Sequence, residues 1–423
     1  MTAVERTRAS LERIDALDGA LRACVLVRRD AAPAEADAVD RRADPGPLAG
    51  LTFAVKDNTD VAGAITTDGL GPPHPAPAAA DATAVRRLRA AGAVLVAKAN
   101  LEQLSFGATT QNPTFGGCRN PWDRTRIPGG SSGGSAVAVA AGLVDVALGT
   151  DTGGSLRNPA AFCGVSALRP THGVVPVAGV TPLSPSMDVV GPIARRVSDL
   201  AKVMDVLAPA QAAPGTAADA EGLAVGIPTT YFLDDLDPGV ARGFDALLDA
   251  LRAIGARPVP IALPGVGAVP DAMAALQNAE AARSLRAYWD DTRLSDGIRE
   301  RMDLGRTRTD EQLAGAEVVA DAWRDTVAGA FAQVAVIATP ATPFTAPPIN
   351  ADNLVALSRR INRCTGPWPL TRAPALVLPL PLAPDGLPVG GQLVAAPGAD
   401  ARLLALGAAL QAHTDWHEQT PPL

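Results

Sequence analysis

Residues 128–164 place two Gly/Ser clusters on either side of a short apolar stretch, and this arrangement constrains the fold more than any other part of the chain. Residues 135–143, SAVAVAAGL, are small and nearly all apolar. A segment that is apolar on every side predicts a helix buried within a core. Residues 144–148, VDVAL, predict a strand that follows this helix. An enclosed helix needs further layers around it, so the segment indicates a layered α/β fold.

Two segments nearer the N-terminus have the same character. Residues 51–55, LTFAV, form an apolar run that ends at Lys56, and this pattern predicts a buried strand that stops at a polar loop. Further along, apolar residues at helical spacing follow Asp81, a candidate N-cap, and stop at Gly92. Residues 94–97, VLVA, then predict a strand. A helix followed by a strand is the unit that builds a sheet covered by helices.

The rest of the chain continues this alternation. We expect a helix at 4–28, a connection at 207–223, a strand at 223–228, a helix at 238–254, further helices up to residue 331, a strand at 334–340, and two strands joined by a Pro-Asp-Gly turn within 373–395. The sequence therefore predicts a single α/β domain, residues 1–423, with α-helices on both faces of a mixed, twisted β-sheet.

Composition excludes several classes of function. The 423 residues carry a net charge of −7 and contain no basic run, so we expect neither nucleic acid nor an anionic membrane as a partner. The N-terminus lacks the uninterrupted apolar core of a signal peptide, and we expect a cytoplasmic protein. The four cysteines are widely separated and form no CxxC pair, which argues against a structural zinc site or a disulfide framework.

Lysine is rare in this sequence. Only Lys56, Lys98 and Lys202 occur among 37 basic side chains, so the chain uses arginine wherever a plain positive charge is sufficient. An amine can lose its proton, whereas a guanidinium stays charged in proteins. A lysine at the end of an apolar strand, as Lys56 is, is therefore a candidate proton acceptor. The alternative is a structural lysine that pairs with Asp57, and Lys98 is a weaker candidate of the same kind.

The two Gly/Ser clusters could both serve acyl chemistry. In GTDTGGS, the two glycines before Ser155 let backbone N–H groups approach a reacting atom closely. Those amides could form an oxyanion hole for a carbonyl that Ser155 attacks. The other cluster, GGSSGGS, offers Ser131, Ser132 and Ser135 just before the predicted helix. The alternative for both clusters is helix capping and tight turns, and for Ser135 we favour capping.

Three other motifs fit less well. Residues 129–133 match G-x-S-x-G, with His413 or His417 downstream, but no strand precedes them as a nucleophile elbow requires. The glycine spacing is similar to that of a phosphate loop, yet Ser135 stands where such a loop has its lysine. No S-x-x-K motif occurs at any of the three lysines, which argues against an arrangement of the penicillin-binding type.

Several separated motifs together resemble the amidase signature family. They are GLTFAVKDNTDVAG, AKANLEQLSFG, PGGSSGGSAVAVAAG, ALGTDTGGSLRNPAAFCGVSALRPTHGVVP and SPSMDVVGPIARRVSDL. The resemblance covers nearly the whole chain and is most specific between residues 48 and 200, the signature core. The family it points to includes simple amidases and the catalytic subunits of glutamyl-tRNA amidotransferases, and the resemblance implies the α/β fold of that family.

The resemblance implies a Ser–cis-Ser–Lys triad. Matched motif by motif, Lys56 is the base, Ser131 is the bridging serine and Ser155 is the nucleophile. The peptide bond between Gly130 and Ser131 is then cis, and Ser132 is a supporting donor. The backbone amides of four consecutive residues would form the oxyanion hole: Thr152, Gly153, Gly154 and Ser155. Asp151 and Arg157 we expect to be a structural ion pair.

The resemblance implies amide C–N hydrolysis through an acyl-enzyme on Ser155, with no metal and no organic cofactor. The expected partner is a small-molecule amide, and a homodimer is compatible with the family. Two alternatives stay open: acyl transfer to an amine or alcohol, and a glutaminase-like subunit of an amidotransferase. Against the second, INRCTGPWPLT has Arg363 where we would align an acid for the glutamine amino group. In the family the C-terminal third contributes the substrate pocket, and there Arg363 and Trp368 are the candidate substrate-binding residues.

Overall fold

The computed structural model describes residues 1–71, 76–209, 220–351 and 354–423. Its strands form one mixed sheet of eleven strands in the order β1-β3-β2-β4-β6-β5-β10-β11-β9-β7-β8. The strands are β1 (Cys24–Val27), β2 (Thr52–Lys56), β3 (Val94–Ala99), β4 (Val146–Asp151), β5 (Ser166–Arg169), β6 (Val189–Ala194), β7 (Ala224–Pro228), β8 (Arg257–Ile261), β9 (Val336–Pro340), β10 (Ala375–Pro379) and β11 (Gly390–Ala395).

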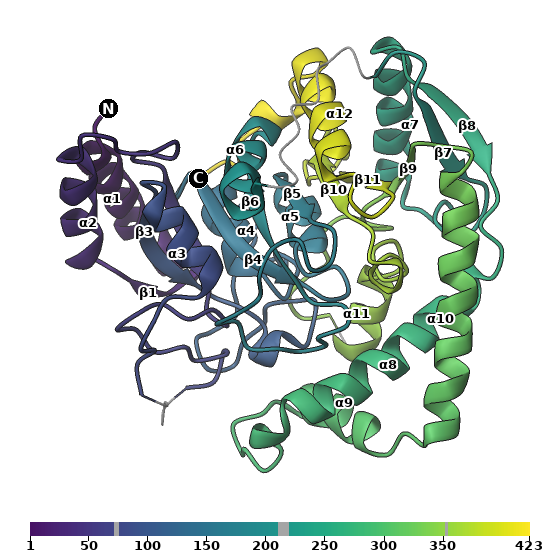
Figure 1. Cartoon of the computed structure of the whole chain (residues 1–423), viewed down its shortest axis with the longest axis horizontal. Helices are drawn as coiled ribbons and strands as arrows, with labels where there is room; N and C mark the ends of the chain where they lie inside the picture. The colour runs from purple at the N-terminus through teal and green to yellow at the C-terminus, as the bar shows by residue number, and fades with distance from the viewer. Residues whose placement is uncertain (72–75, 210–219, 352–353) are drawn as a thin grey trace.

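Helices cover both faces of this sheet, as expected from the sequence (Figure 1). They are α1 (Ala3–Leu21), α2 (Ala31–Asp40), α3 (Thr83–Ala90), α4 (Gly133–Ala140), α5 (Arg157–Cys163), α6 (Val197–Leu207), α7 (Pro238–Ala253), α8 (Val269–Ser284), α9 (Asp296–Arg306), α10 (Asp310–Phe331), α11 (Leu354–Ile361) and α12 (Asp400–His413). Among the described residues, no helix is long and apolar enough to cross a membrane.

The two faces of the sheet have separate apolar cores because side chains alternate along each strand. In β2, Phe53 and Val55 pack into a cluster with residues of α3, α6, α7 and α12. Ala54, between them, packs on the other face with residues of α1, α4 and α5. All eight residues of α4 are buried, which confirms the helix expected from the small apolar stretch. The small side chains let α4 pack closely against the sheet.

Two predicted helix boundaries were wrong. The helix expected at residues 4–28 ends at Leu21, where Arg22 takes a left-handed conformation (φ 55°) and breaks the helix before β1 begins. Asp81 does not cap α3. Its carboxylate instead accepts a hydrogen bond from the backbone N–H of Ala62 at 2.8 Å and pairs with Arg89. A tertiary contact has therefore replaced the local cap.

The other predicted elements are present, and residues 210–219 of the predicted connection lie outside the described residues. The Pro-Asp-Gly turn joins β10 and β11 as an antiparallel pair. The sheet consists of two halves, since β1 to β6 lie on one side of the β5–β10 pairing and β7 to β11 on the other. The helix α8 packs against both α9 and α10, which follow it in the chain (Figure 1).

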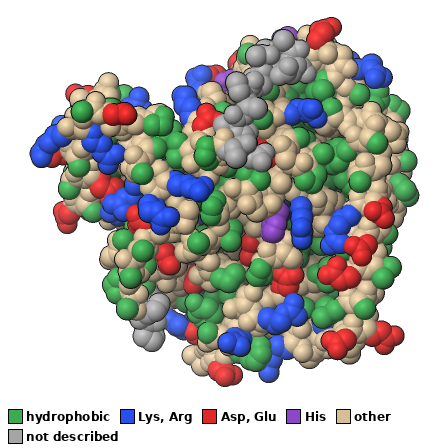
Figure 2. All heavy atoms as spheres, in the orientation of Figure 1, with side chains coloured by type: hydrophobic (Ala, Val, Ile, Leu, Met, Phe, Trp, Pro, Cys, Tyr) green, Lys and Arg blue, Asp and Glu red, His purple; other side chains and the backbone are tan. Residues whose placement is uncertain are grey.

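The surface carries charges of both signs. On the face drawn in Figure 2, Lys and Arg side chains are interspersed with Asp and Glu side chains, and apolar side chains lie between them. The chain contains 37 basic and 44 acidic residues, in keeping with this mixture.

Candidate active site

Lys56 is the last residue of β2 and is fully buried. Its Nζ lies 2.7 Å from Ser131 Oγ and 2.7 Å from Thr150 Oγ1. Burial lowers the pKa of the Lys56 amine to about 7, and the nearby carboxylates of Asp188 and Asp151 only partly oppose this effect. An amine of this kind is a mixture of neutral and charged forms near neutral pH, so it can both accept and return a proton.

The segment that carries Ser131 is held close to the sheet. The peptide bond between Gly130 and Ser131 is cis, as the resemblance implied. Ser132 Oγ donates to the carbonyl of Thr150 at 3.1 Å and accepts from the Thr150 N–H at 3.2 Å. Gly134 has no room for a side chain, because a Cβ there would lie 2.4 Å from the carbonyl oxygen of Asn100. These contacts fix Ser131 against the end of β4.

Ser135 does not cap the helix, contrary to expectation. Its hydroxyl donates to the carbonyl of Leu148 in β4 at 3.1 Å, and α4 begins without a side-chain cap. The Ser135 hydroxyl therefore links α4 to strand β4 instead of capping the helix.

Ser155 follows β4 in the other Gly/Ser cluster. Its carbonyl accepts a hydrogen bond from the Ser132 N–H at 3.2 Å, so the two clusters contact each other directly. Gly154 has φ 142°, and a Cβ there would lie 2.2 Å from Thr365 Oγ1, so only glycine fits. Among the residues that the structure describes, Ser155 Oγ makes no hydrogen bond, including to Ser131. Ser155 itself is partly exposed, whereas Ser131 is buried.

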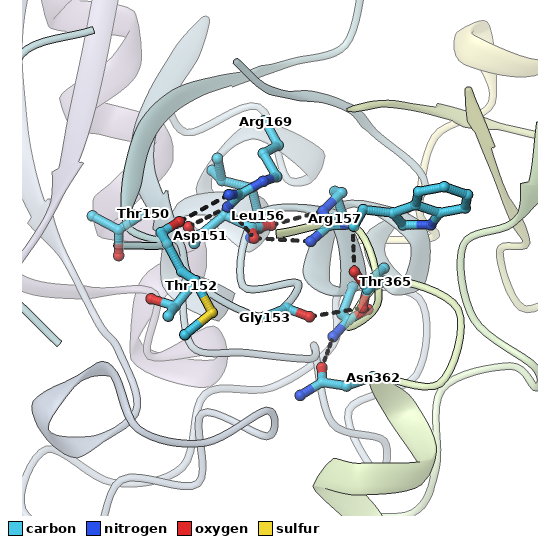
Figure 3. A network of polar contacts seen from close by, with 12 residues as sticks. Thr150, Asp151, Thr152, Gly153, Leu156, Arg157, Arg169, Asn362 and Thr365 are labelled. Atoms are coloured by element: carbon cyan, nitrogen blue, oxygen red, sulfur yellow. Dashed lines mark hydrogen bonds and ion pairs between the residues drawn. The ribbon is translucent and has the colours of Figure 1, made fainter. Parts of the chain in front are cut away.

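A buried ionic network fixes the start of this loop (Figure 3). Asp151 pairs with Arg157 and with Arg169, each at 3.0 Å, and all three side chains are fully buried. Burial by itself would raise the pKa of Asp151, but the two arginines hold it well below its ordinary value. The expected structural pair of Asp151 and Arg157 is confirmed, with Arg169 as a third member.

The C-terminal third completes this network. Arg157 donates to the Thr365 carbonyl and to Gln392 Oε1, each at 2.8 Å. Thr365 Oγ1 donates to the carbonyl of Gly153 at 3.0 Å, and the Asn158 amide donates to Asn362 Oδ1 (Figure 3). The chain from residue 362 onward thus positions the loop that carries Ser155.

Lys98 is the structural lysine. Its Nζ pairs with Asp57 at 2.6 Å, and both side chains are buried. The same amine donates to the carbonyl of Ile65 at 2.9 Å and to Thr66 Oγ1 at 3.1 Å. The pairing with Asp57 that we considered for Lys56 is therefore made by its neighbour.

The two candidate substrate-binding residues lie in different surroundings. Trp368 is fully buried between Phe232 and Trp323, and its indole N–H donates to the carbonyl of Cys364 at 2.9 Å. It presents no surface to a substrate, which favours a packing role. Arg363 is partly exposed and donates to the carbonyl of Asp234.

Some contacts of the site were not visible in the sequence. We had assigned no role to Thr150, although it contacts Lys56 as closely as Ser131 does. Thr150 stands two residues after Leu148, so alternation along β4 predicts the face of Leu148 and Val55 for it and not the face of Lys56, and this pattern does not indicate the contact. Thr365 and Gln392 lie more than 200 residues from their partner Arg157, and no local pattern indicates them.

Comparison with known proteins places this geometry in a family. The sequence profile of the Amidase family matches residues 5–404. The chain belongs to the Amidase family. Among curated proteins, it is similar to the A subunit of the glutamyl-tRNA(Gln) amidotransferase of Chloroflexus aurantiacus. The two are 37% identical over 472 aligned positions, which cover 100% of this chain and 96% of that protein.

Solved amidase structures share the fold. One described as an amidase superimposes with a TM-score of 0.90 at 35% identity, covering 97% of this chain and 96% of that one. A 6-aminohexanoate cyclic dimer hydrolase complexed with its substrate superimposes with a TM-score of 0.88 at 26% identity, covering 100% and 96%. Relatives of this amidase family protein thus include both hydrolases and one component of an amidotransferase.

Proposed function

We propose that this protein hydrolyses a small-molecule amide through an acyl-enzyme on Ser155, with Ser131 and Lys56 as the proton relay. The observation that carries the proposal is the 2.7 Å contact between Lys56 Nζ and Ser131 Oγ in a fully buried setting. A buried amine with a pKa of about 7 can take a proton at neutral pH, as the relay requires.

The reaction has two halves. Ser155 Oγ attacks the amide carbonyl, and its proton passes through Ser131 Oγ to Lys56. The backbone N–H groups of residues 152–155 stabilise the oxyanion. The C–N bond breaks as the proton returns through Ser131 to the leaving nitrogen. Water then attacks the ester and transfers a proton to Lys56 by the same route. The C–O bond to Ser155 breaks as that proton returns through Ser131 to Ser155 Oγ, and the carboxylic acid leaves.

Ser155 Oγ makes no hydrogen bond to any described residue, which is compatible with this role. Catalytic hydrogen bonds are often long before substrate binds and shorten in the complex. The loop around Ser155 is nevertheless well fixed, because Thr365 and Asn158 hold it on one side and Ser132 on the other.

We further propose that residues 1–423 act as one catalytic domain, since the strands share one sheet.

The direct test is ammonia release from a panel of small primary amides. We expect release by the wild type and a loss of at least about a thousandfold for Ser155→Ala and for Lys56→Ala. Lys202→Ala is the matched control, because Lys202 is an exposed lysine that pairs only with Asp199 among the described residues. Labelling of Ser155 by a fluorophosphonate gives a second reading that needs no substrate. A wild type that is neither labelled nor active would refute the proposal.

A second candidate is the glutaminase-like component of an amidotransferase. It is favoured by the match, over the full length of this chain, to the A subunits of glutamyl-tRNA(Gln) amidotransferases. Such a component would pass ammonia to a partner protein, so it would be labelled at Ser155 but inactive alone on the amide panel. Glutaminase activity that appears only when the partner proteins are added would favour it.

Acyl transfer to an acceptor other than water uses the same intermediate. It differs from hydrolysis only in the group that attacks the ester, so the partition of the acyl-enzyme between water and an added amine distinguishes the two.

We retain Arg363 as a candidate for binding a carboxylate on the substrate. If this is correct, Arg363→Ala raises KM for an acidic amide much more than KM for its neutral analogue.

A further inference from the structure

A small cavity adjoins the catalytic lysine. It has a volume of about 70 Å³, and we call it the Thr150 cavity because Thr150, the second hydrogen-bond partner of Lys56, lies in its wall. One part of the wall is polar, with Asn58, Ser105 and Asp188, and the rest includes valine, leucine and proline side chains. A single water needs only about 10–15 Å³ of this kind of volume, so the cavity has room for a small polar group of a few non-hydrogen atoms.

Ser105 points to a missing ligand. It is 6% exposed, and its Oγ has no hydrogen-bond partner among the residues that the structure describes. Its backbone has φ 59°, a left-handed conformation that few residues other than glycine adopt readily. A buried hydroxyl without a partner is uncommon and calls for an explanation. Because Ser105 lines the Thr150 cavity, a group bound there would supply the partner.

Asp68 is a buried carboxylate close to the wall of the Thr150 cavity. It is 3% exposed, and Tyr288 donates to its Oδ2 at 2.9 Å, whereas Oδ1 has no hydrogen-bond partner within the described part of the chain. Burial raises the pKa of Asp68 to about 6, and the hydroxyls of Thr181 and Tyr288 lower it in part. Thr181 also lines the cavity. The Asp68 carbonyl accepts from the Leu104 N–H at 2.7 Å, which brings Asp68 next to the turn that carries Ser105.

Two buried cations, Lys98 and Arg169, lie close enough to Asp68 and Asp188 respectively to lower the pKa of each carboxylate, but neither carboxylate forms an ion pair among the described residues. Asp57 has its own cation, Lys98, but Asp68 takes part in no ion pair among the described residues. Asp188, in the cavity wall, accepts from Thr152 Oγ1 at 2.5 Å and from the N–H groups of Leu183 and Ser184 at 2.9 Å. Lys56 is neutral when it acts as a base. A buried carboxylate without a cation is costly, and a bound cation removes that cost.

From this we propose that the Thr150 cavity binds the ammonium group of an amino-bearing amide substrate, which donates to Ser105 Oγ while Asp68 and Asp188 supply the opposing charge. The inference rests on the proposed function and names the substrate class. The cavity size fits an ammonium with about one methylene. The apolar wall suits a short aliphatic linker, and a carboxylate would be repelled.

The test compares two amides of the same shape, glycinamide and propionamide. Glycinamide carries an ammonium group where propionamide carries a methyl group. We expect wild-type kcat/KM to be at least about tenfold higher for glycinamide, the size of one hydrogen bond to a charged group. Asp68→Asn and Ser105→Gly should each bring this ratio toward one and leave kcat/KM for propionamide within about threefold, because neither residue belongs to the proposed relay. Asparagine and glycine both accept a left-handed backbone, so these variants suit the native conformations.

A second measurement uses the wild type and needs no substrate. Methylammonium should slow the labelling of Ser155 by a fluorophosphonate several-fold, whereas methanol at the same concentration and ionic strength should not. Asp68→Asn should abolish the protection. If Ser155 is labelled and methylammonium gives no protection, or if the glycinamide preference survives in Asp68→Asn, the cavity holds structural water only and the inference is overturned. Absence of both labelling and turnover would instead overturn the proposed function.

Discussion

The ends of two neighbouring parallel strands, β2 and β3, place two lysines in opposite situations. Lys56 and Lys98 are both fully buried, yet Lys98 faces the carboxylate of Asp57 at 2.6 Å and Lys56 faces two hydroxyls at 2.7 Å. A carboxylate fixes the charge of its lysine, whereas hydroxyls accept either form of the amine. Burial alone therefore does not favour a neutral amine. The two lysines differ in the group that accepts the hydrogen bonds of the amine, which is a carboxylate for Lys98 and hydroxyls for Lys56.

Removal of the Lys56 amine gives the largest expected effect. Lys56→Met should lower kcat/KM by about a thousandfold or more, because the relay loses its proton acceptor. The melting temperature of the Lys56→Met variant should equal or exceed that of the wild type, since a buried amine is replaced by an apolar side chain of similar length. Thermal unfolding and amide turnover measured on the same preparation check both parts. A clear fall in stability would make Lys56 a structural residue like Lys98.

Removal of Lys98 should produce the converse result. Lys98→Met leaves Asp57 as an uncompensated buried charge and should cost about 3–5 kcal/mol in the free energy of unfolding. The double variant Asp57→Asn/Lys98→Met should recover part of that loss. Activity per folded molecule should change far less than in Lys56→Met, and denaturant titration with active-site labelling separates the two quantities. Loss of activity without loss of stability would contradict the structural role.

The pH dependence sharpens the comparison further. With the pKa of Lys56 lowered to about 7, kcat/KM should rise about tenfold between pH 6 and pH 8. Stability should respond as well. The folded-state pKa lies below that of the unfolded chain, so the unfolded chain binds more protons between about pH 7 and pH 10.5, and the contribution of Lys56 to unfolding free energy rises with pH there. Lys56→Met should lack this component, and a rise of the same size in the variant would assign it to other groups.

Thr150 should have the smallest of these effects. Thr150→Val removes one acceptor of the Lys56 ammonium, which disfavours the charged form and should move the rising limb of the pH profile down by about one unit. Thr150→Ser keeps the hydroxyl and should leave the limb in place. A pH series on both variants decides the point, and identical profiles would mean that Thr150 is a packing residue.

In the first half of the molecule, β2, β3 and β4 could be predicted from the sequence because they are short apolar runs, whereas β1, β5 and β6 were not predicted. β8 was not predicted, since RPVPI contains two prolines and carries no strand signal, yet it is tolerated at the sheet edge. The pairing of Lys56 with Ser131 followed from the family motifs. Its environment did not, because Thr150, Thr365 and Gln392 act through contacts between distant parts of the chain. Trp368 was proposed because it lies in the C-terminal third that contributes the pocket in the family, and that position does not distinguish a surface indole from a buried one.

The pairing of β5 with β10, which joins the two halves of the sheet, has a consequence during synthesis. Strands β1 to β6 leave the ribosome first, and β5 then has one unpaired edge until β10 arrives. Until that moment Arg157 lacks both Thr365 and Gln392, and the loop around Gly153 lacks the hydroxyl that holds it. A nascent chain therefore contains Lys56, Ser131 and Ser155 long before it can hold them in a working arrangement. The loop that carries Ser155, the proposed nucleophile, therefore gains its last supporting contacts only when the final quarter of the polypeptide has joined the sheet.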